Sequence, residues 1–180
     1  MSSDFSLFIY HTNDIHSHFK NWPKIVEYIK KQRKIHERKN EAMLYFDIGD
    51  HTDRSHPMTE AMEGQGNVDL LNQVGVQAVT IGNNEGLTFS KETLERLYEN
   101  AQFPVIVANL LNANGEIPNW VKPYEIFELP NGAKAGVVGV TAAYYPFYQK
   151  LGWNIRDPYE VLPSLIQKVR EEADFVILLS

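Results

Sequence analysis

Cysteine is absent from the 180-residue chain. Disulfide bonds, thiolate catalysis and zinc sites built from cysteine are therefore excluded. The sequence also has no apolar run approaching the roughly 18 residues of a membrane-spanning segment. Its first residues, Met1 to Phe5, lack the basic start and the long apolar stretch of a secretory signal peptide. We therefore expect a cytoplasmic protein with no membrane-bound segment.

Basic residues are the minority among the charged side chains. The chain has 17 Lys and Arg against 23 Asp and Glu, which gives a net charge of -6. This balance disfavours a large nucleic-acid-binding face, so we expect no nucleic-acid partner. An apolar content of 43% suffices for a sizeable core. Because no repeat, linker or low-complexity segment divides the chain, we expect residues 1–180 to form a single domain.

Strand-like and helix-like patterns alternate along the chain. Short apolar runs predict strands, and apolar residues at spacings of three and four predict amphipathic helices. The predicted strands cover residues 5–11, 42–46, 76–81, 105–109 and 175–179, and the first and the last are expected to be buried. The predicted helices lie near residues 22–34, 59–74, 90–98 and 161–169; Gly64 and Gly66 weaken the middle of the second, and Ser90 is the expected N-cap of the third. An aromatic stretch, residues 144–153, is predicted to be a loop. Alternating strands and helices indicate a largely parallel sheet covered on both faces.

A hairpin interrupts this alternation. Asn131 and Gly132 separate two strand-like runs, residues 124–129 and 134–141. Asn-Gly between apolar runs is a strong signal for an antiparallel hairpin. The fold class that follows is α/β with an antiparallel part, a mixed α+β layered fold.

Three successive predicted strands end in polar clusters. Carboxylate, imidazole and amide oxygen at one sheet edge suit Mn²⁺, Zn²⁺, Fe or Mg²⁺, and ligands bind at the carboxyl edge of open α/β sheets. Each cluster alone is typical of an ordinary turn. Their joint occurrence favours a metal site. The clusters contain Asp14 and His16, then Asp47 and Asp50 after Gly49, and finally Asn83, Asn84 and Glu85 after Gly82.

The order of these motifs resembles a known family. Asp14-x-His16, Gly49-Asp50 and Gly82-Asn83-x-Glu85 are similar to the motifs of the calcineurin-like metallophosphoesterases. The sequence Thr12-Asn13-Asp14-Ile15-His16-Ser17 resembles more closely the branch of 5′-nucleotidases and 2′,3′-cyclic-nucleotide 2′-phosphodiesterases. The resemblance runs from Phe5 to the end of the sequence. It implies the N-terminal part of a four-layer α/β/β/α sandwich of two mixed sheets.

The resemblance also implies a set of metal ligands and an activity. Asp14 and His16 would bind the first of two divalent metal ions, Asp50 would bridge both, and Asn83 would bind the second. The metals are Mn, Zn, Fe or Mg in this family. The implied activity is hydrolysis of a small-molecule phosphoester, with a nucleotide as the family-level substrate, by water bridging the two metals.

One position departs from the family pattern. The family has His after the metal-binding Asn, where it stabilises the transition state or protonates the leaving group. Here the residue is Asn84, which can donate a hydrogen bond but not a proton at neutral pH. We place Asn84 at this catalytic position. His18, His51 and His56 are near in sequence and are alternative proton donors, although a surface or structural role is favoured for each.

A second departure concerns later ligands. The family's domain continues past a strand like residues 175–179 into a metal-ligand His and then a Gly-His-x-His motif. The sequence ends at Ser180 and contains no Gly-His-x-His. We therefore expect a C-terminally truncated metallophosphoesterase domain whose metal site is incomplete and whose own activity is weak or absent.

Two other functions remain open. One is a metallophosphoesterase fold that lost catalysis and serves as a binding module, which Asn84 favours and the four retained ligands disfavour. The other is a generic sugar- or nucleotide-binding α/β domain, which leaves the three polar strand ends unexplained.

Overall fold

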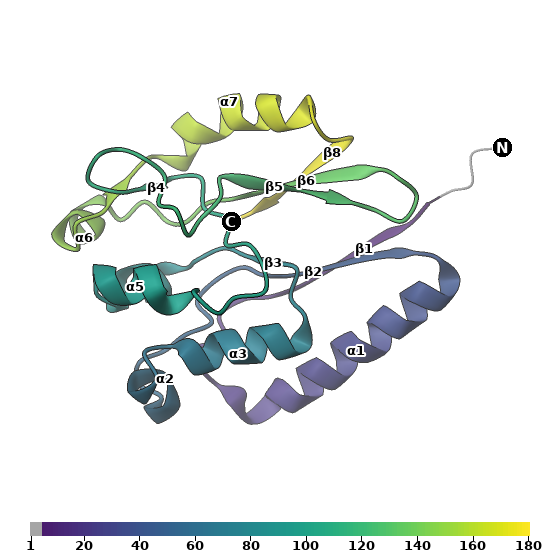
Figure 1. Ribbon diagram of the computed structural model, residues 1–180, viewed down its shortest axis with the longest axis horizontal. Coiled ribbons are helices and arrows are strands. Elements are labelled where there is room, and N and C mark those ends of the chain that lie inside the picture. The colour runs from purple at the N-terminus through teal and green to yellow at the C-terminus, as the bar shows by residue number, and fades with distance from the viewer. Residues whose placement is uncertain (1–4) are drawn as a thin grey trace.

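The computed structural model describes residues 5–180, which form four layers (Figure 1). Helices α1 (Trp22–Lys39) and α3 (Gln65–Val74) cover one sheet, and helix α7 (Pro158–Arg170) covers a second. The two sheets pack face to face between these helical layers. This α/β/β/α order confirms the fold expected from the sequence. The expectation of no signal peptide falls mainly on residues 1–4, which lie outside the described residues.

The first sheet is parallel and carries the predicted site motifs. Its strands are β1 (Leu7–Thr12), β2 (Ala42–Asp47) and β3 (Ala78–Val79), in that order. β1 and β2 pair in register from Leu7 opposite Ala42 to Thr12 opposite Asp47. Because the strands run in the same direction, the segments that follow β1 and β2 leave the sheet at the same edge.

The second sheet is mixed. β5 (Tyr124–Glu128) and β6 (Lys134–Gly139) form the antiparallel hairpin that Asn-Gly predicted, and β8 (Phe175–Leu179) pairs parallel to β6. Two short strands, β4 (Leu110–Leu111) and β7 (Asn154–Ile155), pair separately.

Successive side chains of β2 point to opposite faces of the sheet and pack against different layers. Leu44 and Phe46 belong to the cluster between the sheets, with Val137 from the second sheet. Tyr45 points the other way, into the cluster that contains Val68 of α3. Since both faces of β2 are covered, its sequence is apolar from Ala42 to Phe46 rather than alternating.

The predicted helix over residues 59–74 is wrong as a single element. The chain forms α2 (Pro57–Ala61) and α3 instead. Between them Glu63 and Gly64 adopt left-handed backbone, with φ of +48° and +81°. Left-handed residues cannot continue a right-handed helix, so the segment breaks at this point.

The third strand also differs from the prediction. The strand expected over residues 76–81 is only β3, and the polar cluster after it begins a helix, α4 (Asn83–Thr88). Ser90 caps the following helix, α5 (Lys91–Leu97), as predicted, by accepting from Thr93 N at 3.2 Å. Asn83 and Asn84 therefore lie in a first helical turn.

Three further expectations need correction. The expected strand over residues 105–109 contributes only isolated bridges at Val105 and Ile106. The aromatic stretch contains a helix, α6 (Tyr145–Lys150). The strands β1 and β8 were expected to be buried, but Ile9 and Leu178 are 47% and 41% exposed because both strands are sheet edges.

Helix α1 is the longest helix described, with 18 residues, and it carries many Lys and Arg side chains. Within residues 5–180, no helix combines the length and the apolarity needed to cross a membrane.

Candidate metal centre

The segments after β1 and β2 lie side by side and are joined by backbone hydrogen bonds. Asp14 N donates to Gly49 O at 3.0 Å, His16 N donates to Asp50 O at 2.9 Å, and the next residue pair continues the pattern. This pairing aligns the Asp-x-His motif with the Gly-Asp motif. It brings two predicted ligands from the first segment beside one from the second.

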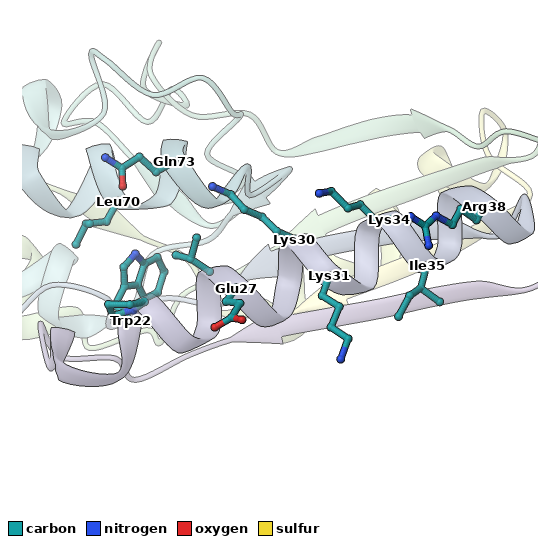
Figure 2. Close-up of a pocket in the computed structure, with 11 residues that line it drawn as sticks. Trp22, Glu27, Lys30, Lys31, Lys34, Ile35, Arg38, Leu70 and Gln73 are labelled. Atoms are coloured by element: carbon teal, nitrogen blue, oxygen red, sulfur yellow. The ribbon is translucent and has the colours of Figure 1, made fainter.

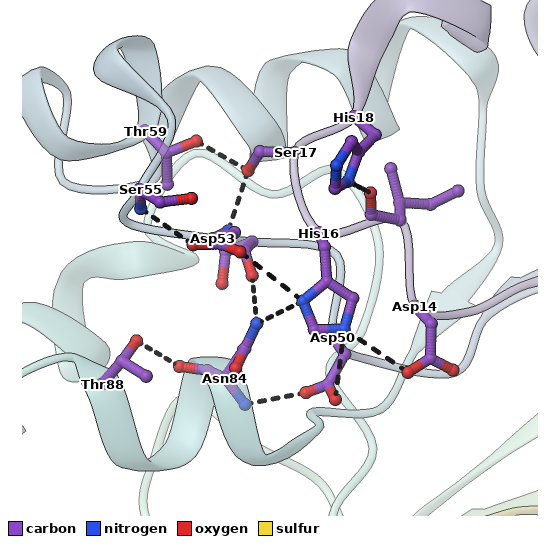
Figure 3. Close-up of polar contacts among 12 residues, drawn as sticks. Asp14, His16, Ser17, His18, Asp50, Asp53, Ser55, Thr59, Asn84 and Thr88 are labelled. Carbon is purple, nitrogen blue, oxygen red and sulfur yellow. Dashed lines mark hydrogen bonds and ion pairs between the residues drawn. The ribbon is translucent and has the colours of Figure 1, made fainter.

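Asp14, His16 and Asp50 can together hold a metal ion. Each offers one ligand atom, and these atoms all lie within 4.8 Å of one another. Nε2 of His16 is 3.5 Å from Asp14 Oδ1 and 3.8 Å from Asp50 Oδ2 (Figure 3). Among residues 5–180, no Lys or Arg forms an ion pair with either carboxylate. A divalent cation fits this donor set, because it supplies the missing positive charge.

Asn83 lies on the Asp50 side of the cluster. Its side-chain amide is 3.3 Å from Asp50 Oδ2. With the amide nitrogen inward, Asn83 donates to Asp50. With the oxygen inward, two acceptors face each other, as ligand oxygens do around a cation. The structure thus brings all four predicted metal ligands to one edge of the sheet.

The backbone at this edge is unusual. Asp14, His16, Ser17 and Asp50 all have positive φ, between +47° and +53°. Left-handed backbone costs a residue with a side chain about 1–2 kcal/mol. Such conformations gather at functional sites, where surrounding contacts hold them in place.

Glu85 is the buried anchor of the Asp50 segment. Its side chain is 1% exposed. Oε2 accepts from the backbone nitrogens of Asp50 and Gly82, both at 2.9 Å. Oε1 accepts from Thr52 N at 2.8 Å and from Thr52 Oγ1 at 2.9 Å. Burial raises the pKa of Glu85, whereas these donors favour its carboxylate form. The sequence identified Glu85 as polar but not as this anchor.

Two glycines allow the segments to approach closely. A Cβ atom on Gly82 would lie 2.1 Å from Asp50 Oδ1, and one on Gly49 would lie 2.3 Å from Gly82 N. Any larger residue would push the Asp50 segment away from the start of α4.

Asn84 contacts a predicted ligand directly. Its Nδ2 lies 2.7 Å from His16 Nδ1 and donates to Thr52 O at 3.0 Å. Its backbone nitrogen donates to Asp50 Oδ1 at 2.7 Å. A catalytic role for Asn84 stays a prediction. Asp53, which the sequence reading missed, places Oδ2 3.8 Å from the same His16 nitrogen.

The three alternative histidines have structural contacts. His51 is 3% exposed, packs edge-on against Trp22, and burial lowers its pKa to about 3. Nδ1 of His18 is 3.2 Å from Ile15 O. His56 caps α2 by accepting from Met58 N at 3.2 Å. These contacts agree with the structural roles favoured from the sequence.

A buried network of hydrogen bonds connects the segments after β1 and β2 to α2 and α3. Ser17 Oγ accepts from Asn67 Nδ2 at 3.0 Å and from Asp53 N at 2.8 Å. Asn67 also donates to His51 O at 3.2 Å and accepts from Thr59 Oγ1 at 2.8 Å. Nothing in the sequence indicated Asn67, because it is far along the chain from both motifs.

A cavity of about 350 Å³ opens at this edge, lined by Asp14, Asp50 and Gly82 among others. A larger groove of about 850 Å³ lies between α1 and α3 (Figure 2). Its lining combines apolar side chains with Lys30, Lys34 and Arg38, and contains no histidine. The cluster of possible metal ligands is therefore at the sheet edge.

Comparison with known proteins identifies the family. The model of the calcineurin-like phosphoesterase family matches residues 8–179. The chain belongs to the calcineurin-like phosphoesterase family. The site motifs described above all lie within the residues that match the family.

Individual relatives agree with this assignment. Over 96% of its length, the chain is 52% identical to "Uncharacterized metallophosphoesterase YunD" of Bacillus subtilis, covering 37% of that protein. Over 98% of its length it is 26% identical to a 5′-nucleotidase of Diplobatis ommata, covering 32% of that protein. The chain thus spans about a third of the length of these curated relatives.

A solved structure supports the fold. The 5′-nucleotidase precursor from Thermus thermophilus aligns with a TM-score of 0.82 at 20% identity. The alignment covers 98% of this chain and 37% of that one.

Proposed function

We propose that the whole protein is a metal-dependent hydrolase of nucleotide phosphoesters, a 5′-nucleotidase or a cyclic-nucleotide phosphodiesterase. The observation that carries the proposal is the cluster of Asp14, His16 and Asp50, with ligand atoms within 4.8 Å, in a calcineurin-like phosphoesterase. The choice of a nucleotide rests on the similarity to 5′-nucleotidases.

Each ligand has a proposed role. Asp14 and His16 would hold one divalent cation, Asp50 would bind both cations, and Asn83 would hold the second. When bound, the cations would supply a water of lowered pKa as nucleophile and would neutralise charge on the phosphoryl oxygens. Glu85 keeps Asp50 in place through the backbone of its segment. The metal is Mn, Zn, Fe or Mg in this proposal.

Two expectations from the sequence stay predictions. One is the cytoplasmic location. The other is that these 180 residues are the truncated N-terminal part of a domain with further histidine ligands. The activity is therefore proposed for the full-length protein.

The test is an assay of full-length protein with Mn²⁺ on AMP and on 2′,3′-cyclic AMP. Asp50→Asn should lower kcat/KM by about 100-fold or more, because it removes a charge that stabilises the reacting centre. The matched control is Asp69→Asn, at an exposed carboxylate of α3. Equal rates for Asp50→Asn and wild type would contradict the bridging role.

One observation favours a second function, a binding module without catalysis. The Asn84 nitrogen is engaged by His16 and Thr52 rather than directed at a substrate. A protein that loads metal and binds phosphoesters without hydrolysing them would support this alternative.

A further inference from the structure

The orientation of the Asn84 amide is fixed by its surroundings. Its Nδ2 is 3.0 Å from Thr52 O, a carbonyl that can only accept, so the nitrogen end must face Thr52. The same nitrogen is 2.7 Å from His16 Nδ1 (Figure 3). The two amide hydrogens are therefore shared between the carbonyl and the ring, and His16 Nδ1 is the acceptor.

This contact selects one tautomer of His16. With Nδ1 accepting, a neutral ring carries its proton on Nε2. Nε2 is also the atom that faces Asp14 and Asp50. A cation bound there needs the Nε2 lone pair, so the ring must then carry its proton on Nδ1. In that tautomer Asn84 presents a donor to a donor and no longer stabilises the ring.

Asp53 is placed to accept the proton on Nδ1. Its Oδ2 lies 3.8 Å from that nitrogen. The rest of the residue is held: Oδ1 accepts from Ser55 N at 2.8 Å, and the Asp53 backbone nitrogen donates to Ser17 Oγ at 2.8 Å. One carboxylate oxygen is thus fixed, and the other faces His16 (Figure 3).

We propose that Asp53 is a positioning residue that holds His16 in its metal-binding tautomer, in competition with Asn84. The exchange conserves protons: one proton leaves Nε2 for solvent and one is taken up at Nδ1, where Asp53 accepts it in a hydrogen bond. The inference rests on the proposed metal centre and assigns it a carboxylate partner beyond the ligands themselves.

The first measurement is the affinity of the full-length protein for Mn²⁺, by isothermal titration calorimetry. Loss of such a partner typically weakens metal binding by about 10–100-fold, and we expect this for Asp53→Asn. Asp69→Asn is the matched control and should bind like wild type. Asp53→Asn binding within about twofold of wild type would overturn the inference.

The second measurement reads the tautomer directly, by ¹⁵N NMR of the His16 ring with and without Zn²⁺. Metal-free wild type should carry its proton on Nε2 and the Zn²⁺-loaded protein on Nδ1. Asn84→Ala removes the competing donor, so its metal-free ring should shift toward the Nδ1 tautomer relative to metal-free wild type. Purely structural roles for Asp53 and Asn84 would leave the tautomer unchanged.

The outcomes separate this inference from the proposed function. Wild type that binds no Mn²⁺ would contradict the metal centre itself. Wild type that binds Mn²⁺ but carries its metal-free proton on Nδ1 would overturn only the role given to Asn84 and Asp53. This last test needs no variant, so it stands even if a substitution disturbs folding.

Discussion

At the scale of single residues, buried carboxylates organise the site. Glu85 accepts four hydrogen bonds from the Asp50 segment and the start of α4. Asp47, at the end of β2, is 1% exposed and accepts from Thr12 Oγ1 at 2.6 Å. Neither residue is a proposed metal ligand, yet both fix the backbone from which the ligands project.

Glu85→Gln tests the anchor. Glutamine replaces one carboxylate oxygen with an NH₂ group, which cannot accept a hydrogen bond. The two buried donors that face that oxygen in wild type are then unpaired. We expect the free energy of unfolding to fall by about 2–4 kcal/mol, measured by urea denaturation. The exposed Glu99→Gln should change it by less than about 0.5 kcal/mol. Similar small losses for both variants would contradict the anchoring role.

Asp47 predicts a pH dependence of stability. Burial raises its pKa to about 8, against about 3.9 in an unfolded chain. Between these values the folded state binds the extra proton, so stability should fall as pH rises from about 4 to 8. In EDTA, the free energy of unfolding should fall between pH 5 and 7, and this fall should be about 2 kcal/mol smaller in Asp47→Asn than in wild type. Equal slopes would contradict this assignment.

At the scale of elements, the site depends on close approach of the β2–α2 segment to the start of α4. Gly82→Ala places a Cβ atom 2.1 Å from Asp50 Oδ1 and 2.5 Å from Asp50 N. We expect a loss of about 1–3 kcal/mol in stability and weaker Mn²⁺ binding. Gly115→Ala is the comparison, because its φ is +81° but nothing lies within 4 Å of its Cβ position. It should cost stability without changing Mn²⁺ affinity, and weaker binding there would contradict the steric argument.

The sequence predicted elements best where patterns are local. The Asn-Gly hairpin and the Ser90 cap were confirmed, since each depends on a few adjacent residues. The single helix over residues 59–74 was wrong because the chain turns left-handed at Glu63 and Gly64, where a Cβ atom on Gly64 would lie 2.5 Å from Leu97 Cδ1 of a distant segment. The motifs indicated Asp14, His16 and Asp50, but contacts of Asp53 and Asn67 arise only when distant segments meet.

At the scale of the whole molecule, metal binding should stabilise the fold. The ligands come from separate segments after β1 and β2, so the unfolded chain offers no preformed site. At a Mn²⁺ concentration of about 100 times Kd, the free energy of unfolding should rise by about 2.7 kcal/mol. Thermal or urea unfolding with Mn²⁺ and with EDTA measures this change. No difference between the two would contradict ligation in the folded state.

The central claim is that the edge formed by β1, β2 and the start of α4 is a two-metal centre. The most direct test is the metal content of purified full-length protein, measured by inductively coupled plasma mass spectrometry for wild type and Asp50→Asn. We predict close to two divalent ions per wild-type chain and clearly fewer in the variant. A wild-type content well below two ions per chain, after loading with Mn²⁺ or Zn²⁺, would contradict the claim.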